Sequence, residues 1–294
     1  MAPVYFADAS QTAGPGHTWE VDSSFDLHCQ RRALFSGSAS VYDAGRPGYP
    51  AEVFELLATQ CGLEAGSRVV EIGPGTGQAT GPLLDAGANV VAVELGAEMA
   101  TLLEENHGSR HLTIVVGAFE DVDLPAQGFD IVASATAFHW VDPAVGLIRS
   151  ADLLRPGGSL ALWWNYFGDP HRSDPFHDAI QPLLQSHAPQ LIDCTSGGAP
   201  GSGAHPYALD VDARVDEIGR TGRFGAVRYE AVSWTGRHSA SEIHRMFGSF
   251  SPWLALESTV RGKLLDALAN LVEQDFGGTV RRPYLTPIYT AQRI

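Results

Sequence analysis

A regular alternation of strand-like and helix-like segments, beginning near residue 51, limits the fold of this chain more than any other feature. Short apolar runs typical of buried strands occupy residues 67–73, 89–95, 112–117, 129–135 and 159–165. Three segments have the apolar spacing of helices: 51–62 before the first run, 76–87 between the first and second runs, and 97–108 between the second and third. Strands that alternate with helices form a parallel sheet with helices on both faces. Such sheets bind ligands at the carboxyl ends of their strands, beside the first strand.

A glycine-rich turn follows the first of these strands, in the sequence Glu-Ile-Gly-Pro-Gly-Thr-Gly-Gln at 71–78. Dinucleotide turns have the pattern G-x-G-x-x-G, but Gln78 stands where the third glycine would be. A phosphate-binding P-loop needs Gly-Lys-Ser/Thr, and the chain's only lysine is Lys263. The acid Glu71, just before the turn, suits a cation or an ammonium group better than an anion. The turn therefore predicts a nucleoside-like ligand without a required phosphate.

A second acid, Glu94, ends the second predicted strand. A carboxylate at this point accepts two hydrogen bonds from a ribose diol, although it also fits a solvated strand end. Together with Glu71 and the glycines, it describes a ligand that carries a ribose and a positive charge. S-adenosylmethionine has both.

Several motifs, in order along the chain, resemble those of class I S-adenosylmethionine-dependent methyltransferases. They are EIGPGTGQ (71–78), VELGAEMA (93–100), FEDVDLP (119–125), FDIVASATAFHWVDP (129–143) and LLRPGG (153–158). YDAGRPGYP (42–50) and FGGTVRRPYLTPIY (276–289) are similar to a bacterial small-molecule subgroup near the trans-aconitate and ubiquinone-biosynthesis enzymes. The resemblance runs from about residue 35 onward. It implies a Rossmann-like α/β fold: a seven-stranded, mostly parallel sheet with helices on both faces, an antiparallel last strand and a helical lid insertion.

The resemblance also implies which residues hold the cofactor, whose product would be S-adenosylhomocysteine. Glu71, Gly73, Gly75 and Gly77 would hold the methionine part. Glu94 would bind the ribose, with Leu95 beside the adenine. Tyr42 and Arg46 would reach the carboxylate, for which the guanidinium fork is well suited, or Arg46 would form a surface ion pair.

The adenine contact departs from the family pattern. Many relatives have an acid directly after the third strand, where this chain has Gly117-Ala118-Phe119-Glu120. Ala118 has no side-chain acceptor, so either Glu120 or the backbone of Ala118 and Phe119 would orient the adenine. Ala135 and Thr136, at the end of the fourth strand, complete the expected cofactor set.

Three residues are candidates for the chemistry. Methyl transfer needs alignment of acceptor and donor, and a base where the acceptor must lose a proton. His139 follows the fourth strand and has a suitable pKa for a base, but it also fits a structural role in shaping the cofactor pocket. Glu20, in the segment expected to cover the site, would assist His139 or is a plain surface residue, and Tyr42 is the third candidate.

The acceptor is expected to be a small molecule of a biosynthetic pathway, such as secondary metabolism, and aromatic or indole-like. Aromatic side chains favour a flat acceptor, although they also fit core packing. Candidate substrate contacts are Trp19, Phe138, His139, Tyr166, Phe167, Trp234 and Phe247. Methyl ester formation on a carboxylic acid is an alternative, with Arg172, Arg237 and Arg245 as sources of positive charge. A cofactor-binding protein without transfer activity, such as a cyclase or a sensor, and a nicotinamide-dependent oxidoreductase are further alternatives.

The organisation expected from these patterns has three parts. Residues 1–40 form an arm over the active site, 41–168 the S-adenosylmethionine-binding core, and 169–294 a helical lid and substrate region whose last strands complete the sheet. In this last part, helices are expected at 174–187, 239–250 and 257–277, a loop at 195–206, and strands at 226–235 and 279–293. The prolines of 279–293 favour a position near the sheet edge.

Composition and charge set further expectations. A formal net charge of −15 disfavours nucleic-acid binding. The sequence has no apolar run of the ~18–20 residues that cross a bilayer, and its first residues lack the pattern of a secretory signal. Its three cysteines lack metal-ligand spacing, and Asp169, His171, Asp174 and His177 fit a polar loop better than a metal site. We therefore expect a cytoplasmic monomer or homodimer without a metal.

Overall fold

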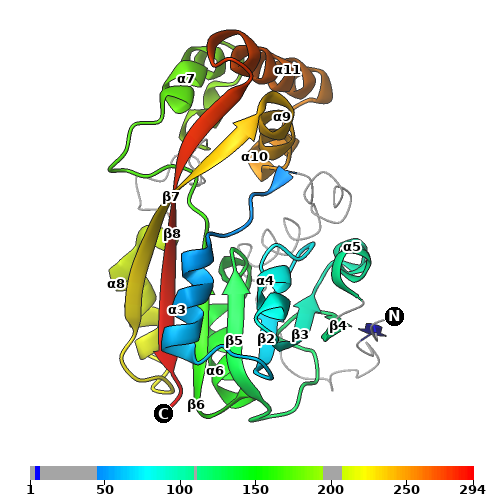
Figure 1. Ribbon diagram of the computed structural model, residues 1–294, viewed down its shortest axis with the longest axis vertical. Coiled ribbons are helices and arrows are strands. Elements are labelled where there is room, and N and C mark those ends of the chain that lie inside the picture. Colours follow the sequence, from blue (N-terminus) through cyan, green and yellow to red (C-terminus); the bar gives the residue numbers. More distant parts are fainter. Residues whose placement is uncertain (1–3, 7–44, 109–110, 195–206) are drawn as a thin grey trace, which may run out of the picture.

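The computed structural model describes residues 4–6, 45–108, 111–194 and 207–294, and these form an eight-stranded sheet with helices around it (Figure 1). The strand order is β1-β4-β3-β2-β5-β6-β8-β7. The strands are β1 Val4–Phe6, β2 Arg68–Ile72, β3 Asn89–Glu94, β4 Leu112–Val116, β5 Phe129–Ala135, β6 Leu154–Trp163, β7 Arg228–Ser239 and β8 Thr279–Gln292. Strands β1 to β6 pair in parallel, as the alternating sequence pattern predicts.

Helices cover both faces of the parallel part of the sheet. On one face lie α3 (Ala51–Cys61), α4 (Thr80–Asp85) and α5 (Ala97–His107), which bury Leu57, Leu83 and Leu103 against the strands. The other face is covered by α6 (Pro143–Leu153) and α8 (Val211–Gly219), which contribute Leu147 and Ile218 to a second core. The central strands are buried on both faces and are therefore almost entirely apolar.

The last strand, β8, is antiparallel to both of its neighbours, β6 and β7. The predicted fold class is thus confirmed, and the three-residue strand β1 adds to the edge of the sheet beside β4. β8 lies next to the edge strand β7, which agrees with the predicted position near the sheet edge. Pro283 and Pro287 are tolerated because β8 pairs with β6 only from Ile288 onward, so both prolines lie beyond the end of β6. There Pro287 still accepts a hydrogen bond from the Trp164 amide.

Four helices form a separate layer, which we call the helical cap: α7 (Pro175–His187), α9 (Ala240–Gly248), α10 (Ser251–Leu254) and α11 (Ser258–Asp275). The cap has its own apolar core, which includes Phe176, Ile243, Phe247, Trp253 and Leu268. Figure 1 shows the cap carried on the upper parts of β7 and β8, above the carboxyl ends of the parallel strands. The cap is therefore the layer that faces the ligand edge of the sheet.

Local signals fixed the helix boundaries in the cap. Ser239 and Glu242 form the predicted capping box, in which the Ser239 hydroxyl accepts from the Glu242 amide and the Glu242 carboxylate accepts from the Ser239 amide. The predicted strand pair joined by helices is β7 and β8, with α9, α10 and α11 between them. The predicted loop at 195–206 lies outside the described residues.

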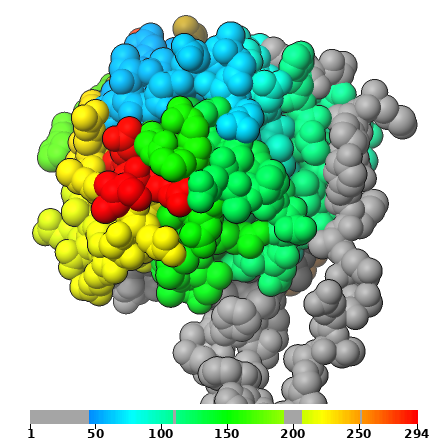
Figure 2. Space-filling view, turned by 90° about the horizontal axis from the view of Figure 1, so that it is seen from below, coloured from blue at the N-terminus to red at the C-terminus, as the bar shows by residue number. Residues whose placement is uncertain are grey.

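The C-terminal residues lie at the end of the molecule opposite the helical cap, which Figure 2 shows from below. The C-terminal residues, in red, lie there between segments coloured blue, green and yellow. The Arg293 carbonyl accepts from the Gly157 amide, and the Ile294 amide donates to the Arg223 carbonyl. Within the described part of the chain, none of the helices has the length and apolarity that spanning a bilayer requires.

Candidate active site

The glycine turn between β2 and α4 uses glycine because other residues would not fit. Gly73, Gly75 and Gly77 have φ values of 64°, 59° and 106°, in the region that favours glycine. A Cβ atom on Gly73 would lie 2.5 Å from the Ala137 Cβ, and one on Gly77 would lie 2.4 Å from the His107 ring. The turn extends to residue 79, so α4 begins at Thr80 rather than at the predicted 76.

Glu71, at the end of β2, is fully buried directly before this turn. Its Oε2 atom accepts a 2.6 Å hydrogen bond from the Thr80 hydroxyl, and its Oε1 atom has no hydrogen-bond partner among the described residues. Burial raises the pKa of this carboxyl to about 7, against the opposing effect of the Thr80 hydrogen bond. A buried acceptor without a donor is costly, so the site favours a nearby cationic or N–H donor.

Glu94, at the end of β3, ties the glycine turn to the start of α5. Its two carboxylate oxygens accept from the amides of Gly75, at 3.0 Å, and Gly96, at 2.9 Å. Burial raises the pKa of Glu94, and these hydrogen bonds oppose the shift. Because each carboxylate oxygen has two lone pairs, both can also accept from a ribose hydroxyl. Leu95 follows with an exposed side chain, available to an adenine ring.

The segment after β4 carries the residues from which the sequence predicts an adenine contact. The Phe119 side chain is buried in the core beneath α6, with the Arg149 guanidinium 5.6 Å from its ring centroid. Glu120 accepts a long 3.4 Å hydrogen bond from the Asp142 amide. Of the two adenine contacts expected from the sequence, that of Phe119 is thus restricted to its backbone, and that of Glu120 stays a prediction.

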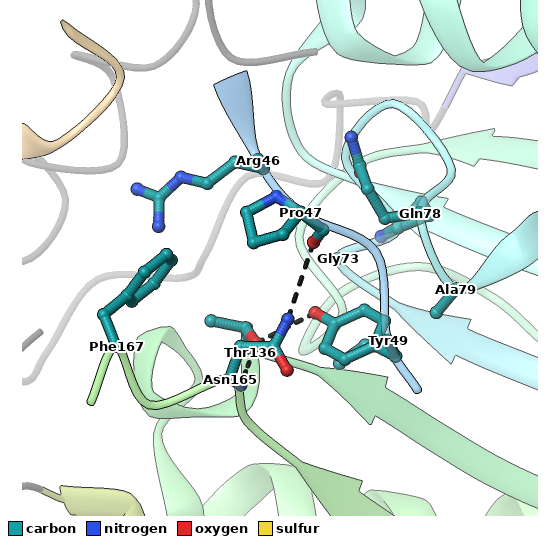
Figure 3. A pocket seen from close by; sticks show the side chains of 11 residues that line it. Arg46, Pro47, Tyr49, Gly73, Gln78, Ala79, Thr136, Asn165 and Phe167 are labelled. Carbon is teal, nitrogen blue, oxygen red and sulfur yellow. Dashed lines mark hydrogen bonds between the residues drawn. The ribbon is translucent and has the colours of Figure 1, made fainter. Parts of the chain in front are cut away.

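A pocket opens between the glycine turn and the ends of β5 and β6 (Figure 3). Its lining comes from segments far apart in the chain: Arg46, Pro47, Tyr49, Gly73, Pro74, Gln78, Ala79, Ala135, Thr136, Asn165 and Phe167. Among these, Arg46, Gly73, Ala135, Thr136 and Phe167 were predicted as cofactor or substrate residues. The structure brings them together at the edge of the sheet where the resemblance places the cofactor.

Thr136 is the polar centre of this pocket. Its backbone has a φ of 55°, and its amide donates to the Trp163 carbonyl at 2.7 Å. Its hydroxyl oxygen accepts from the Tyr49 hydroxyl at 2.9 Å and from the backbone amide of Asn165 at 3.2 Å. These bonds hold the ends of β5 and β6 against the segment that precedes α3.

Asn165 links this segment to β8. Its side-chain amide donates to the Gly48 carbonyl at 2.9 Å, and its oxygen accepts from the Thr286 hydroxyl at 2.8 Å. The Thr286 hydroxyl oxygen in turn accepts from the Trp234 indole N–H at 2.9 Å. Asn165 and Trp234 thus use their polar groups within the protein.

Arg46 reaches from the same segment to the helical cap. Its guanidinium lies 4.7 Å from the Phe250 ring centroid and 5.7 Å from that of Phe167. It also donates to the Ser249 carbonyl at 3.3 Å. These contacts place the Arg46 side chain between the pocket and the helical cap.

His139 lies in a single 3₁₀ turn, η1 (Phe138–Trp140), after β5. The Trp164 indole N–H donates to its Nδ1 atom at 3.1 Å. Nδ1 therefore carries no proton, and the neutral ring carries its proton on Nε2. This tautomer has no unprotonated nitrogen left for base work unless the Trp164 hydrogen bond is broken. Trp140 packs beside the His139 ring, with the ring centroids 4.9 Å apart.

Two of the predicted substrate residues are buried in apolar cores, and a third, the half-buried Trp234, packs against one. Phe138 is fully buried in the core under α6, and Phe247 is fully buried in the cap core, so neither side chain can line a pocket. Trp234 stacks on Tyr284 with the ring centroids 4.4 Å apart. In each case aromatic character marked core packing. Tyr166 is half-buried and forms a β-bridge with Leu285, and Glu20, Tyr42 and Trp19 lie outside the described residues.

Sequence reasoning missed Tyr49 and Gln78 as site residues, whereas Asn165 was expected to be able to line an acceptor pocket together with Tyr166 and Phe167. Tyr49 belongs to the quoted motif YDAGRPGYP, so its place beside Arg46 was an available signal. Asn165 is the last residue of the fifth predicted strand, at the ligand edge, and Gln78 follows the last glycine of the turn. No pattern in the local sequence shows that Asn165 bonds Gly48.

The polar residues after β6 belong to structural contacts. Asp169 accepts from the Ser233 hydroxyl and the His171 amide, and Asp174 caps α7 by accepting from the His177 amide. In the described ranges, no group of three or more His, Cys, Asp or Glu side chains is arranged to hold a metal ion.

Comparison with known proteins agrees with this site. Residues 70–162 match the methyltransferase domain family. An uncharacterized methyltransferase of Mycobacterium tuberculosis is 37% identical over 142 residues, which cover 47% of this chain and 56% of the relative. Another, from Geobacillus kaustophilus, is 31% identical over 172 residues, covering 52% of this chain and 80% of the relative. The chain thus spans little more than half the length of the mycobacterial relative.

Solved structures agree in fold. A protein from Anaeromyxobacter dehalogenans assigned as a type II methyltransferase superposes with a TM-score of 0.60 at 21% identity, covering 84% of this chain and 97% of that one. Phosphoethanolamine N-methyltransferase 2 of Haemonchus contortus, solved with phosphomonomethylethanolamine and S-adenosylhomocysteine, gives a TM-score of 0.52 at 15% identity, with coverages of 92% and 60%.

The strand order, the glycine turn and the acid at the end of β3 define the Rossmann-like fold of the methyltransferases. The chain belongs to the class I S-adenosylmethionine-dependent methyltransferases. Its residues fit that cofactor: the turn has no room for side chains at Gly73 and Gly77, Glu94 keeps acceptor capacity for a ribose, and Glu71 holds an unsatisfied acceptor behind the turn.

Proposed function

We propose that this protein transfers a methyl group from S-adenosylmethionine to a small-molecule acceptor bound beneath the helical cap. The observation that carries the proposal is the pocket that joins the glycine turn, Thr136, Asn165 and Arg46 at the carboxyl edge of the sheet. When bound, the cofactor supplies an electrophilic methyl group on a sulfonium centre.

In this proposal, the cofactor is held by three groups of residues. Glu94 accepts from the ribose hydroxyls, and Glu71 supplies negative charge behind the glycine turn. Arg46 binds the carboxylate, because it is the arginine among the described residues that line the pocket. Leu95 and the backbone of Ala118 and Phe119 face the adenine.

The acceptor lies on the side of the pocket formed by Phe167 and Tyr49. Phe167 lines the pocket between Arg46 and the cap, and its ring packs on Phe250 and Tyr284. An aromatic wall at this point supports a flat, aromatic or indole-like acceptor. We place it in small-molecule biosynthesis, including secondary metabolism, in the cytoplasm.

Ester formation on a carboxylic acid is less well supported. It requires a positive charge for the acceptor in addition to the one for the cofactor carboxylate. Arg172 instead donates to the Trp234 carbonyl and the Thr235 hydroxyl on β7, and Arg237 and Arg245 are exposed. Of the described pocket residues, Arg46 alone is positively charged, and the cofactor would use it.

We further propose that His139 positions the site and that rate enhancement comes from alignment of acceptor and methyl group. The Trp164 hydrogen bond supports this role, because it occupies Nδ1, the nitrogen that is unprotonated in the neutral ring. An acceptor whose nucleophile needs no base, or loses its proton to water, suits such a site.

Two measurements test the proposal. The first is calorimetric titration with S-adenosylhomocysteine, with NAD as the control ligand; we expect binding of the former and none of the latter. The second is transfer of a labelled methyl group to a panel of aromatic, indole-like and carboxylic acceptors. Tight cofactor binding with no transfer to any acceptor would favour a sensor or a cyclase instead.

His139→Ala separates the two roles of this residue. If His139 positions the pocket, we expect weaker S-adenosylhomocysteine binding and a fall in turnover below about 10-fold at saturating cofactor. A fall of about 10²-fold or more with unchanged cofactor affinity would instead identify His139 as the base. Trp164→Phe is the companion variant, because it removes the N–H that bonds Nδ1 and keeps an aromatic ring at this buried position.

A further inference from the structure

One short segment, residues 45–49, contacts both the carboxyl edge of the sheet and the helical cap. In Figure 1 it leaves the start of α3 and runs up to the cap beside α10. We propose that Arg46, in this segment, is a positioning residue that couples cofactor binding to the placement of the cap over the acceptor pocket. The inference rests on the proposed function, because the coupling needs a cofactor carboxylate at Arg46.

The sheet side of the segment is firmly anchored. Asn165 donates to the Gly48 carbonyl, and the Tyr49 hydroxyl donates to Thr136. The Tyr49 ring also packs edge-on against Trp163, with the ring centroids 5.9 Å apart. The backbone at residues 47–49 is thereby fixed to the ends of β5 and β6, and Gly45 and Arg46 are the part of the segment that reaches the cap.

On the cap side, the segment contacts the end of α9 and the residues that follow it. A Cβ atom on Gly45 would lie 2.6 Å from the Arg245 carbonyl oxygen, so the two backbones meet closely there. The Arg46 guanidinium donates to the carbonyl of Ser249, the residue that ends α9, and lies over the Phe250 ring. The carboxyl end of a helix carries partial negative charge, which attracts a cation such as this one.

Arg46 has the chemistry to serve both partners at once. A guanidinium has five N–H donors in a rigid plane, and that of Arg46 donates to the Ser249 carbonyl at the long distance of 3.3 Å. Figure 3 shows the side chain extending from beside Pro47 toward Phe167, across the pocket. A carboxylate bound there in the two-pronged manner fixes the plane of the guanidinium. With its plane fixed, the Arg46 guanidinium contacts the Ser249 carbonyl and the Phe250 ring in one orientation.

The coupling is reciprocal by thermodynamic necessity. If cofactor binding steadies the cap, contacts between the cap and Arg46 must strengthen cofactor binding by the same factor. The loaded protein would then hold α9 and α10 in place before the acceptor enters. In this proposal, the contacts of Arg46 favour binding of the cofactor before the acceptor.

The test combines hydrogen exchange with calorimetry on the full chain, using S-adenosylhomocysteine as the ligand. In the wild type, we expect the ligand to slow amide exchange in α9 and α10. Arg46→Met should abolish this slowing and weaken ligand binding by roughly 10- to 100-fold. Arg46→Lys, which keeps the charge without the planar fork, is the second variant in case Arg46→Met folds poorly.

Phe250→Leu provides the sharper measurement, because it removes the ring under the guanidinium without touching the cofactor pocket's glycine turn. We expect it to weaken ligand binding by about 5-fold in the wild-type background and by less than about 1.5-fold in the Arg46→Met background. The matched control is Arg261→Met: this arginine donates to the Leu254 carbonyl at the end of α10, but within the cap. It should leave ligand binding and its effect on exchange unchanged.

The outcomes separate the two levels of the proposal. Equal effects of Phe250→Leu in both backgrounds, or slowed exchange that persists in Arg46→Met and Arg46→Lys, would overturn the coupling while leaving the proposed function intact. Failure of the wild type to bind S-adenosylhomocysteine at all would overturn the proposed function itself.

Discussion

The ion pair between Arg282 and Asp174 permits a quantitative prediction about the stability of the helical cap. Arg282, on β8, is fully buried, and Asp174, directly before α7, is nearly so. One oxygen of Asp174 accepts from the Arg282 Nε at 3.0 Å and lies 3.0 Å from the Nη2 atom of the same guanidinium. The other accepts from the His177 amide at 3.0 Å and caps α7. Asp174→Asn therefore keeps the cap acceptor and removes only the charge.

The magnitude follows from this division of roles. Removing one partner of a buried ion pair leaves an uncompensated charge and costs about 3–5 kcal/mol. For Asp174→Asn we expect a loss of this size in the free energy of unfolding, because the new amide N–H₂ also faces the guanidinium. Asp174→Ala should cost a further 0.5–2 kcal/mol or so for the lost helix cap. Replacing both partners, as Arg282→Met with Asp174→Asn, should recover most of the loss, since Phe176 and Phe247 flank the site with apolar rings.

The assay is urea denaturation, followed by tryptophan fluorescence and far-ultraviolet circular dichroism on the same samples. Trp253 is fully buried in the cap and reports on this layer. The reasoning would be refuted if Asp174→Asn cost less than about 1 kcal/mol, or if the double variant were as unstable as the single one. Either result would mean that the pair is hydrated or that the cap tolerates the buried charge.

Three further predictions concern the cofactor site. Burial raises the pKa of Glu71 from 4.5 to about 7, so between these values the folded protein holds a proton that the unfolded chain has released. Without ligand, the free energy of unfolding should therefore fall by up to about 3 kcal/mol as the pH rises through this window. Glu71→Gln should remove this pH dependence. Urea denaturation of the wild type and the variant from pH 5 to 8 measures it. Glu94→Ala should weaken S-adenosylhomocysteine binding by about 1.5–3 kcal/mol for each hydrogen bond to the charged group, measured by calorimetry, whereas unchanged affinity would remove Glu94 from the ribose site. Gly77→Ala should lower thermal stability and ligand affinity together, because its Cβ would collide with the His107 ring and its φ of 106° disfavours alanine. Adding His107→Ala to Gly77→Ala should relieve the collision but not the backbone strain at residue 77. If the double variant regained the thermal stability and ligand affinity of the wild type, backbone strain would not be a cause of the loss.

The alternating core of the fold was readable from the sequence because its signals are local. Strands at 67–73 and 129–135 have apolar runs of the right length, and Gly62 ends α3 in the left-handed conformation, with a φ of 72°. The glycine turn and Glu94 were readable for the same reason, since a turn between a strand and a helix is encoded in adjacent residues. The order of the last strands was less accessible, because β8 pairs with β6 across more than a hundred residues of chain.

The substrate side was the least predictable part of the site. Phe138, Phe167 and Phe247 look alike in the sequence, yet the structure buries two of them in separate cores and lets Phe167 line the pocket. Periodicity places an aromatic residue on a face of an element but does not tell which neighbour covers that face. Asn165 shows the same limit for a polar residue, because its partners Gly48 and Thr286 are distant in sequence.

The position of β8 between β6 and β7 has a consequence for how the protein is made. The ribosome completes β2 to β6 and the helices that cover them long before it reaches Thr279, where β8 begins. Until β8 has been synthesised, the growing chain exposes the unpaired edge of β6, and β7 has no strand to pair with. An open edge of this kind is where nascent chains associate wrongly with one another. The fraction of newly made protein that reaches the native sheet would thus depend on how soon β8 is released from the ribosome. It would also depend on whether a chaperone shields the edge of β6 until then.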